Sequence, residues 1–190
     1  MIGNDIVDLS AAARESNWER KGFLKKIFTK DEQLLILSSQ QPEVTLWLLW
    51  TMKEAAYKIY SRQKGIRCFA PTSLCCQVDL TLSNNHPHQT TLTVAPSTFK
   101  CKLNTGENKY TGKVLIGDDI YLTESAVNDR LIHSICATNK ADIGQIKAGI
   151  FTTGHPLFHH YHQTKPGCVS HHGSFLALVY LDSGSPLSAN

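Results

Sequence analysis

A long helix over residues 43–60 is the strongest structural signal in the sequence. The segment follows a break at Gln41-Pro42, and its second half, Trp50–Tyr60, has no glycine or proline and is rich in good helix formers. One stripe of this helix, with spacings of three and four, carries Trp47, Trp50, Glu54 and Lys58. An exposed Glu–Lys pair one turn apart contributes only about 0.3 to 0.5 kcal/mol. Because this pair shares its stripe with two tryptophans, we expect the stripe to run from the core into a cleft.

An acidic residue interrupts the apolar opening segment. Residues 2–9 are predicted to form a short strand, in which Gly3 allows an unusual backbone conformation. Asp5 lies in the middle of this strand, where a carboxylate costs free energy unless it is paired, hydrogen-bonded or metal-bound. Asp5 is therefore a candidate site residue. The alternative is that Asp5 caps a turn, as Asp8 is expected to cap the helix that follows.

The opening third of the chain is locally basic. Residues 23–28 are predicted to form a short amphipathic turn, and Thr29 with Glu32 forms a capping-box pattern that opens a helix through Leu34, Leu35 and Leu37. The basic residues of this region are Arg14, Arg20, Lys21, Lys25 and Lys26. A solvated face is the commoner explanation of such charges, and an acidic partner is the sharper one.

Beyond Pro71 the pattern changes from helical to β-like. Short apolar runs separated by Asn, Gly and Pro predict an antiparallel sheet, at residues 74–82, 90–94, 99–103 and 113–122. Residues 127–137 are compatible with a strand or a short helix. The segment 167–180 is predicted to end in a buried strand, with a small polar first half where backbone N–H groups and a histidine can meet an anion.

Together these elements predict an α+β fold with an antiparallel sheet packed against the long helix. We expect a single domain over residues 1–182 and a flexible tail over residues 183–190. A net charge of +3 argues against a dedicated nucleic-acid-binding protein. The opening residues lack a signal peptide, and no apolar run approaches the roughly 18 residues of a membrane span, so we expect a cytoplasmic protein with no membrane partner.

Two groups of potential metal ligands give no metal prediction of their own. The six cysteines contain no C-x-x-C pair, so we expect reduced thiols and neither a zinc site nor a disulfide framework. Four histidines lie close together at positions 155, 159, 160 and 162. Their spacing fits no standard zinc pattern, and a surface loop is the preferred interpretation of residues 154–163.

Three segments in a fixed order resemble the 4'-phosphopantetheinyl transferase superfamily. They are Gly3-Asn4-Asp5-Ile6-Val7, then Trp50-Thr51-Met52-Lys53-Glu54-Ala55-Ala56-Tyr57-Lys58, and finally Val169-Ser170-His171-His172-Gly173. A Phe-x-x-Arg-Ile-x-Thr run of the family is also matched, by residues 23–29. The resemblance covers about residues 1–70 and 167–181.

The resemblance implies an enzymatic activity and a set of roles. Members of this kind transfer the 4'-phosphopantetheine arm of coenzyme A to a serine of an acyl or peptidyl carrier protein, and adenosine 3',5'-bisphosphate is released. By position, Asp5 and Glu54 would hold Mg²⁺, Glu54 and Lys58 would be catalytic, and the coenzyme A contacts would be Lys53, Lys58, Arg67 and His171, with His172 as a weaker candidate for the 3'-phosphate. The basic residues of the opening third would dock an acidic carrier protein.

Departures from the family pattern affect the metal site and the assembly. Val7 stands where larger members have a second acid, Cys168 replaces the first serine of Ser-x-Ser-His, and Asn4 replaces an apolar residue or threonine. Residues 95–165 are expected to include an insertion relative to the small members. Because each motif occurs once, we expect a homo-oligomer, with a trimer favoured, in which His171 acts beside a neighbour's Glu54.

Two alternatives to the transferase remain open at this point. One is a non-catalytic relative that binds coenzyme A or a carrier protein without transfer, which Val7 and Cys168 favour. The other is an unrelated α+β interaction domain, in which Glu54 and Lys58 form an ordinary helix-surface pair.

Overall fold

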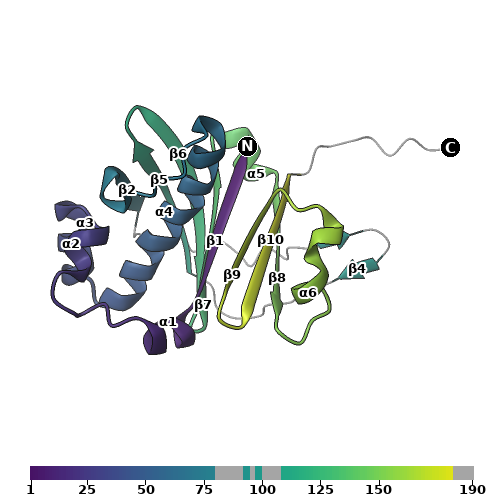
Figure 1. Cartoon of the computed structure of the whole chain (residues 1–190), viewed down its shortest axis with the longest axis horizontal. Coiled ribbons are helices and arrows are strands. Elements are labelled where there is room, and N and C mark those ends of the chain that lie inside the picture. The colour runs from purple at the N-terminus through teal and green to yellow at the C-terminus, as the bar shows by residue number, and fades with distance from the viewer. Residues whose placement is uncertain (80–91, 95–96, 100–107, 182–190) are drawn as a thin grey trace.

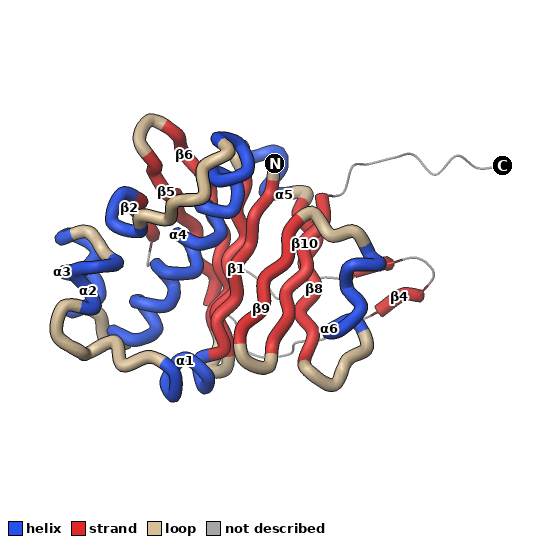
Figure 2. The backbone as a smooth tube through the Cα atoms, viewed as in Figure 1, coloured by secondary structure: helices blue, strands red, loops and turns tan. Residues whose placement is uncertain are grey.

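The computed structural model in Figure 1 describes residues 1–79, 92–94, 97–99 and 108–181. Helices gather on one side of a sheet, and a second, smaller sheet lies beside the first (Figures 1 and 2). In chain order the elements are β1 (Ile2–Asp8), α1 (Leu9–Glu15), α2 (Phe23–Ile27), α3 (Lys30–Ser38), α4 (Pro42–Lys64), η1 (Pro71–Ser73), β2 (Leu74–Asp79), β3 (Leu92–Val94), β4 (Ser97–Phe99), β5 (Asn108–Ile116), β6 (Asp119–Val127), β7 (Leu131–Ala137), α5 (Lys140–Gly144), β8 (Ile146–Thr152), α6 (Leu157–His160), η2 (Tyr161–Thr164), β9 (Cys168–His172) and β10 (Phe175–Leu181).

The large sheet has the order β1-β7-β6-β5-β2, and all its neighbouring strands are antiparallel. Helix α4 crosses this sheet and buries Leu49, Met52 and Ile59 completely in the main core. The predicted α+β fold, an antiparallel sheet packed against a long helix, is confirmed. The helix is longer than predicted at both ends. Pro42 is acceptable in its first turn, and the helix continues to Lys64 because Gly65, with a left-handed backbone at φ 68°, is the residue that ends it.

The caps predicted at the start of the chain are present. Asp8 Oδ1 accepts a hydrogen bond from the Ala11 amide at the start of α1. Thr29 and Glu32 form the complete capping box of α3, with each side chain bonded to the other residue's amide. Local sequence rules therefore fix the first turn of both helices.

Several predicted boundaries change. Residues 131–137 of the ambiguous segment form strand β7. The buried strand predicted at the end of segment 167–180 is present as β10, and the first half of the segment forms β9, which pairs with β10 across a turn at Gly173 with φ 54°. The predicted loop over residues 154–163 contains the short helices α6 and η2. Residues 80–82, 90–91, 100–103 and the predicted tail 183–190 lie outside the described residues.

The range that is predicted to include an insertion supplies strands to both sheets. Of the range 95–165, residues 108–137 supply β5, β6 and β7, which occupy the middle of the large sheet. This part belongs to the core architecture. The smaller antiparallel sheet, with order β8-β10-β9, follows it in the chain.

Side chains, rather than a neighbouring strand, close the free edge of β1. Two basic residues of α4 bond to its carbonyls: Arg62 donates to the Ile2 oxygen, and Lys58 donates to the Asn4 oxygen at 2.8 Å. Two residues of β9 accept from its amides, Ser170 Oγ from Ile6 at 3.1 Å and His172 Nδ1 from Asp8 at 3.0 Å. An unpaired strand edge is thereby satisfied, and the small sheet is attached to the large one.

Gly3 and Asn4 also fit β1 to its neighbours, α4 and the small sheet. A Cβ atom at Gly3 would lie 2.2 Å from the Ala55 carbonyl oxygen, so glycine is required here by the close approach of β1 to α4 rather than by an unusual backbone angle. Asn4 is fully buried, and its Nδ2 donates to the Ala177 oxygen of β10 at 3.2 Å and lies 3.4 Å from His133 Nε2. The asparagine thus links the two sheets.

Candidate active site

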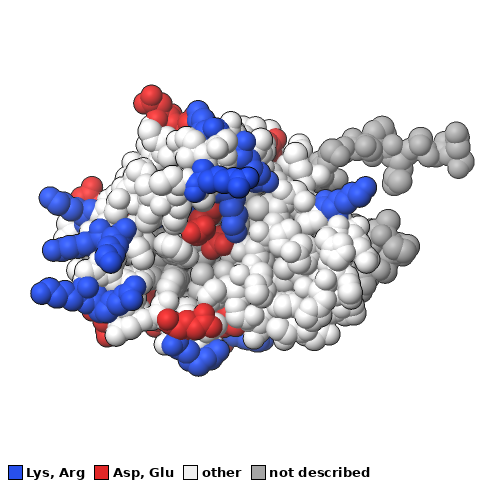
Figure 3. Space-filling model, in the orientation of Figure 1, with Lys and Arg blue, Asp and Glu red and all other residues white. Residues whose placement is uncertain are grey.

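A pocket of about 350 Å³ lies where β1, α4 and β9 meet. Asp5 of β1, Glu54 and Trp50 of α4, and His171 and His172 of β9 all line it. The stripe predicted on α4 does lead from the core into a cleft, because Trp47 is buried at one end and Glu54 is only half-buried. Acidic atoms lie directly beside basic atoms near the middle of the face that Figure 3 shows.

Asp5 has one carboxylate oxygen fully engaged. Its Oδ1 accepts from Lys58 Nζ at 2.9 Å and from Ser170 Oγ at 2.7 Å. Among the described residues, Oδ2 has no hydrogen-bond donor. The alternative that Asp5 merely caps a turn is wrong, because its partners come from α4 and β9.

Glu54 lies close enough to Asp5 for the two carboxylates to repel each other. Burial, followed by the negative charge of Asp5, raises the pKa of Glu54 to about 7, and the positive charge of Lys58 opposes this rise. The hydrogen-bonded pair is Lys58–Asp5, so the interpretation of Glu54 and Lys58 as an ordinary helix-surface pair is wrong. Glu54 can accept or release a proton near neutral pH.

Lys58 keeps part of its hydrogen-bonding capacity. An ammonium group carries three N–H donors, and two of them are used on Asp5 Oδ1 and the Asn4 oxygen. The side chain is 27% exposed. One donor therefore remains for an anion that approaches Asp5.

The donor set of the pocket suits a hard divalent cation. Two neighbouring carboxylates fit Mg²⁺, which commonly takes one or two protein carboxylates together with water and substrate phosphates. No group of three metal-ligating side chains occurs in the part of the chain that the structure describes, which does not favour a zinc-type cage. Val7 lines the pocket from the core side and supplies no ligand.

The two histidines of β9 differ in freedom. His172 Nδ1 accepts from the Asp8 amide, so its neutral form carries the proton on Nε2, which lies 3.7 Å from Glu15 Oε2. His171 is exposed, and its ring contacts Phe158 of α6 edge-to-face at 5.2 Å. His171 is thus the freer of the two, in line with the preference given to it from the sequence.

The expectation that His171 acts beside a neighbour's Glu54 is not supported. The two residues line the same pocket within one chain, because the β9–β10 hairpin packs against β1. Asp5, Glu54 and His171 therefore meet without a second copy of the chain, and the homo-oligomer, with a trimer favoured, stays a prediction.

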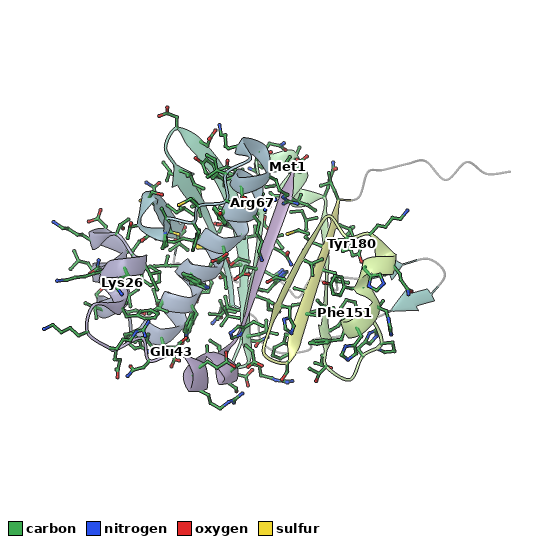
Figure 4. All side chains as sticks on the ribbon, in the orientation of Figure 1. Met1, Lys26, Glu43, Arg67, Phe151 and Tyr180 are labelled. Atoms are coloured by element: carbon green, nitrogen blue, oxygen red, sulfur yellow. The ribbon has the colours of Figure 1, made fainter. Side chains whose placement is uncertain are left out.

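Two predicted coenzyme A contacts do not reach the pocket. Lys53 is fully buried, and its three donors are used on Glu32 Oε2 at 2.7 Å, the Ile27 oxygen at 3.0 Å and the Pro71 oxygen at 2.7 Å. Arg67 is exposed in the segment after the C-terminal end of α4 (Figure 4) and does not line the pocket. Lys53 is a structural residue because it has no donor left for a ligand.

The predicted basic residues are all exposed and lie on α1, α2 and the loop between them. Arg20, Lys21 and Lys25 line a second pocket of about 350 Å³ together with Trp18 and Leu37. Arg14 and Lys26 are also exposed, and basic side chains protrude from the left side of the molecule in Figure 3, near the labelled Lys26 of Figure 4.

Helix α3 adds apolar surface to this face. Leu34 and Leu37 are 68% and 62% exposed, whereas Glu32 of the same helix is buried against Lys53. The exposure of these leucines and the burial of Glu32 were not predicted, because the apolar pattern of α3 favours buried leucines.

Ser170 and His172 were missed as residues that act on β1. Their alternation along β9 is the signal that could have found them, since residues 170 and 172 share one face of a strand and residue 171 lies on the other.

Two neighbouring carboxylates with an adjacent lysine, in an α+β fold, are typical of proteins that handle phosphate esters. A family profile described as the 4'-phosphopantetheinyl transferase superfamily matches residues 1–136. The chain therefore belongs to this superfamily and is a transferase of the phosphopantetheinyl kind. No curated protein matches the chain significantly.

The matched segment has a clear limit. It includes β1, α4 and most of β7, and it ends before the small sheet that carries Ser170 and His171. A separate observation concerns helix length and polarity: no helix in the described parts of the chain is both long and apolar enough to cross a membrane.

Proposed function

We propose that this protein transfers 4'-phosphopantetheine from coenzyme A to a serine of an acyl or peptidyl carrier protein, with Mg²⁺, and releases adenosine 3',5'-bisphosphate. The observation that carries the proposal is that Asp5 and Glu54 line one pocket and that Lys58 bonds to Asp5 at 2.9 Å. Superfamily membership supplies the class of reaction.

Asp5 and Glu54 are the residues that would hold Mg²⁺. When bound, the cation supplies positive charge for the pyrophosphate oxygens and lowers the repulsion between the two carboxylates. Asp5 suits this role because Oδ2 has no donor among the described residues, and Glu54 suits it because it lacks a full salt-bridge partner.

The remaining roles follow from hydrogen-bonding capacity. The serine hydroxyl oxygen forms a bond to the phosphorus that bears the pantetheine arm, and the bond from that phosphorus to the bridging oxygen breaks. The hydroxyl proton passes to Glu54, directly or through water, because this carboxylate lines the same pocket as Asp5. The remaining donor of Lys58 bonds to a phosphate oxygen, and exposed His171 contacts the 3'-phosphate.

Docking of the carrier protein is assigned to the exposed basic face. Arg20, Lys21 and Lys25 offer positive charge, and the neighbouring Leu34 and Leu37 offer apolar surface. A carrier protein with an acidic amphipathic helix fits this combination. Arg14 and Lys26 extend the same positive field.

We also propose that one chain forms a complete site within a single domain ending near residue 182. In support, Asp5, Glu54 and His171 line one pocket without a second copy. The cytoplasm is the proposed location, because the described cysteines are all free thiols.

The deciding experiment incubates the protein with apo carrier protein, coenzyme A and Mg²⁺ and follows the carrier by intact mass spectrometry. We expect the mass of one phosphopantetheine arm to be added, and Glu54→Gln and Asp5→Asn to slow its addition by at least about 1,000-fold, in the range of losses seen for essential catalytic groups. Ser134→Ala, a change at a buried serine of β7 that does not line the pocket, is the matched control.

A different outcome would support the non-catalytic alternative. Val7 in place of a second acid and Cys168 in place of a serine are the observations that favour it. Binding of coenzyme A by the wild-type chain, with no mass added to any of several carrier proteins, would reject transfer and retain binding.

A further inference from the structure

Ser170 is placed to control the orientation of Asp5. Its hydroxyl oxygen accepts from the Ile6 amide at 3.1 Å, and the hydroxyl lies 2.7 Å from Asp5 Oδ1. A serine hydroxyl has one proton. Because the Ile6 amide is itself a donor, that proton must go to Asp5, and the direction of the bond is fixed.

The environment makes this contact a strong one. Ser170 is 6% exposed, and the Asp5 side chain is 12% exposed. A distance of 2.7 Å is typical of a hydroxyl that donates to a carboxylate. The contact joins residues 165 positions apart and links β9 to β1.

Ser170 and Lys58 bond to the same oxygen but differ in how firmly they are held. Lys58 has a long side chain, is 27% exposed, and is the residue that would also bond to a phosphate. Ser170 is short and is held by a backbone amide of β1. If Lys58 shifts toward a bound phosphate, Ser170 still holds Oδ1.

We propose that Ser170 is a positioning residue that holds Asp5 Oδ1 and so leaves Oδ2 free to bind the divalent cation. The inference deepens the proposed function and rests on it. Partners of this kind orient a metal ligand, and their loss typically weakens metal affinity by 10 to 100-fold.

The test measures Mn²⁺ binding to the whole protein, without coenzyme A or carrier protein, by electron paramagnetic resonance of the free ion. We expect Ser170→Ala to raise the Kd for Mn²⁺ about tenfold. Ser134→Ala is the matched control, since this buried hydroxyl lies on the strand residue paired with Asp5 but bonds to Thr51 and Ser125 instead. We expect its Kd to stay within about twofold of wild type, because Ser134 shares no hydrogen-bond partner with Asp5 among the described residues.

A second binding measurement separates positioning from substrate contact. Calorimetry with coenzyme A in the absence of divalent cations should give the same Kd for wild type and Ser170→Ala. A weakened coenzyme A affinity with an unchanged Mn²⁺ affinity would make Ser170 a substrate contact and overturn the proposal. Ser170→Cys, which keeps the size and donates weakly, replaces the alanine variant if that variant does not fold.

Failure of this inference can be told apart from failure of the proposed function. Mn²⁺ binding that is weakened by Asp5→Asn but not by Ser170→Ala overturns only the role of Ser170. Equal weakening by Ser170→Ala and Ser134→Ala also overturns it, since general loosening then explains both. Absence of any Mn²⁺ binding by the wild-type protein overturns the metal site and the role of Ser170 together.

Discussion

Helix α4 carries two lysine–carboxylate pairs whose lysines are only five residues apart, and the two pairs differ in what they leave unused. Lys53 and Glu32 lie 2.7 Å apart with side chains 0% and 2% exposed. Lys58 and Asp5 lie 2.9 Å apart and are 27% and 12% exposed. The first pair is closed to solvent, whereas the second is open, because Asp5 lines the pocket and Lys58 is partly exposed.

Hydrogen-bond accounting explains the difference. Lys53 spends all three donors inside the protein, and Glu32 accepts from Lys53, the Thr29 amide and the Cys76 amide. Lys58 has one donor left, and Asp5 Oδ2 has no donor among the described residues. The pair Lys58–Asp5, whose hydrogen-bonding groups are incompletely used, can therefore bind a ligand. The pair Lys53–Glu32, whose hydrogen-bonding groups are all used, stabilises the fold.

The largest expected effect is on stability at the closed pair. Lys53→Ala leaves Glu32 charged and buried without its cation, which should lower the free energy of unfolding by about 3 to 5 kcal/mol. Lys58→Ala should lower it by only about 1 kcal/mol, because the pair is partly solvated. Urea unfolding of both variants measures the difference, and equal losses would contradict the distinction between the pairs.

The second expected effect is a pH dependence of stability that comes from His133, a buried residue near Lys58. Complete burial, and then the positive charge of Lys58, lower the pKa of this histidine to about 4 from 6.5. The unfolded chain therefore binds a proton that the folded chain resists, so stability should fall as the pH drops from about 6.5 toward 4, by up to about 3 kcal/mol from this group.

Urea unfolding between pH 7 and pH 4.5 checks this. A His133→Gln variant should show a flatter dependence of unfolding free energy on pH over the same interval. A slope as steep as that of wild type would show that other groups cause the loss.

The third expected effect is on the rate of transfer. Lys58→Ala should slow phosphopantetheine transfer about 100-fold, equivalent to about 2.7 kcal/mol, because one donor to the phosphates is lost. The folded fraction of Lys53→Ala, measured at low temperature, should retain a rate within about threefold of wild type. Single-turnover mass spectrometry of the carrier measures both rates, and a slow Lys53→Ala would place that lysine in the catalytic machinery.

The smallest expected effect concerns the exposed basic residues Arg20 and Lys25, which belong to neither pair. The double charge reversal Arg20→Glu/Lys25→Glu should raise the KM for the carrier protein about tenfold at low salt and leave kcat unchanged, since exposed charges steer association. The difference should shrink at 0.5 M salt. An unchanged KM at low salt would remove this face from the docking proposal.

Much of this architecture could be predicted from local patterns. The α4 stripe, the acid in β1, the capping box of Thr29 and Glu32, and the Asp8 cap all depend on residues close in sequence, and all are present. The run predicted over residues 113–122 is wrong as a single strand, because Gly117, with φ 59°, turns the chain between β5 and β6.

The burial of Glu32 and the role of Lys53 could not be predicted in this way. A capping-box glutamate is normally exposed, and only the docking of α3, η1 and β2 around α4 encloses it. The salt-bridge partner of Lys58 could not be predicted for the same reason. The helix pattern places Glu54 next to Lys58, but tertiary packing brings Asp5 closer. Ser170 bonds to a residue 165 positions away, beyond the reach of any local rule.

The closed edge of β1 also bears on the order in which the molecule is assembled. The amides of Ile6 and Asp8 receive their partners from residues 164 positions later in the chain. A ribosome working at a few to about 20 residues per second would expose β1 for many seconds before β9 emerges. Until then Asp5 lacks its serine partner, so the candidate site can mature only after β9 has been synthesised. Proteolytic loss of the β9–β10 hairpin should consequently silence the site while most of the large-sheet core remains in place.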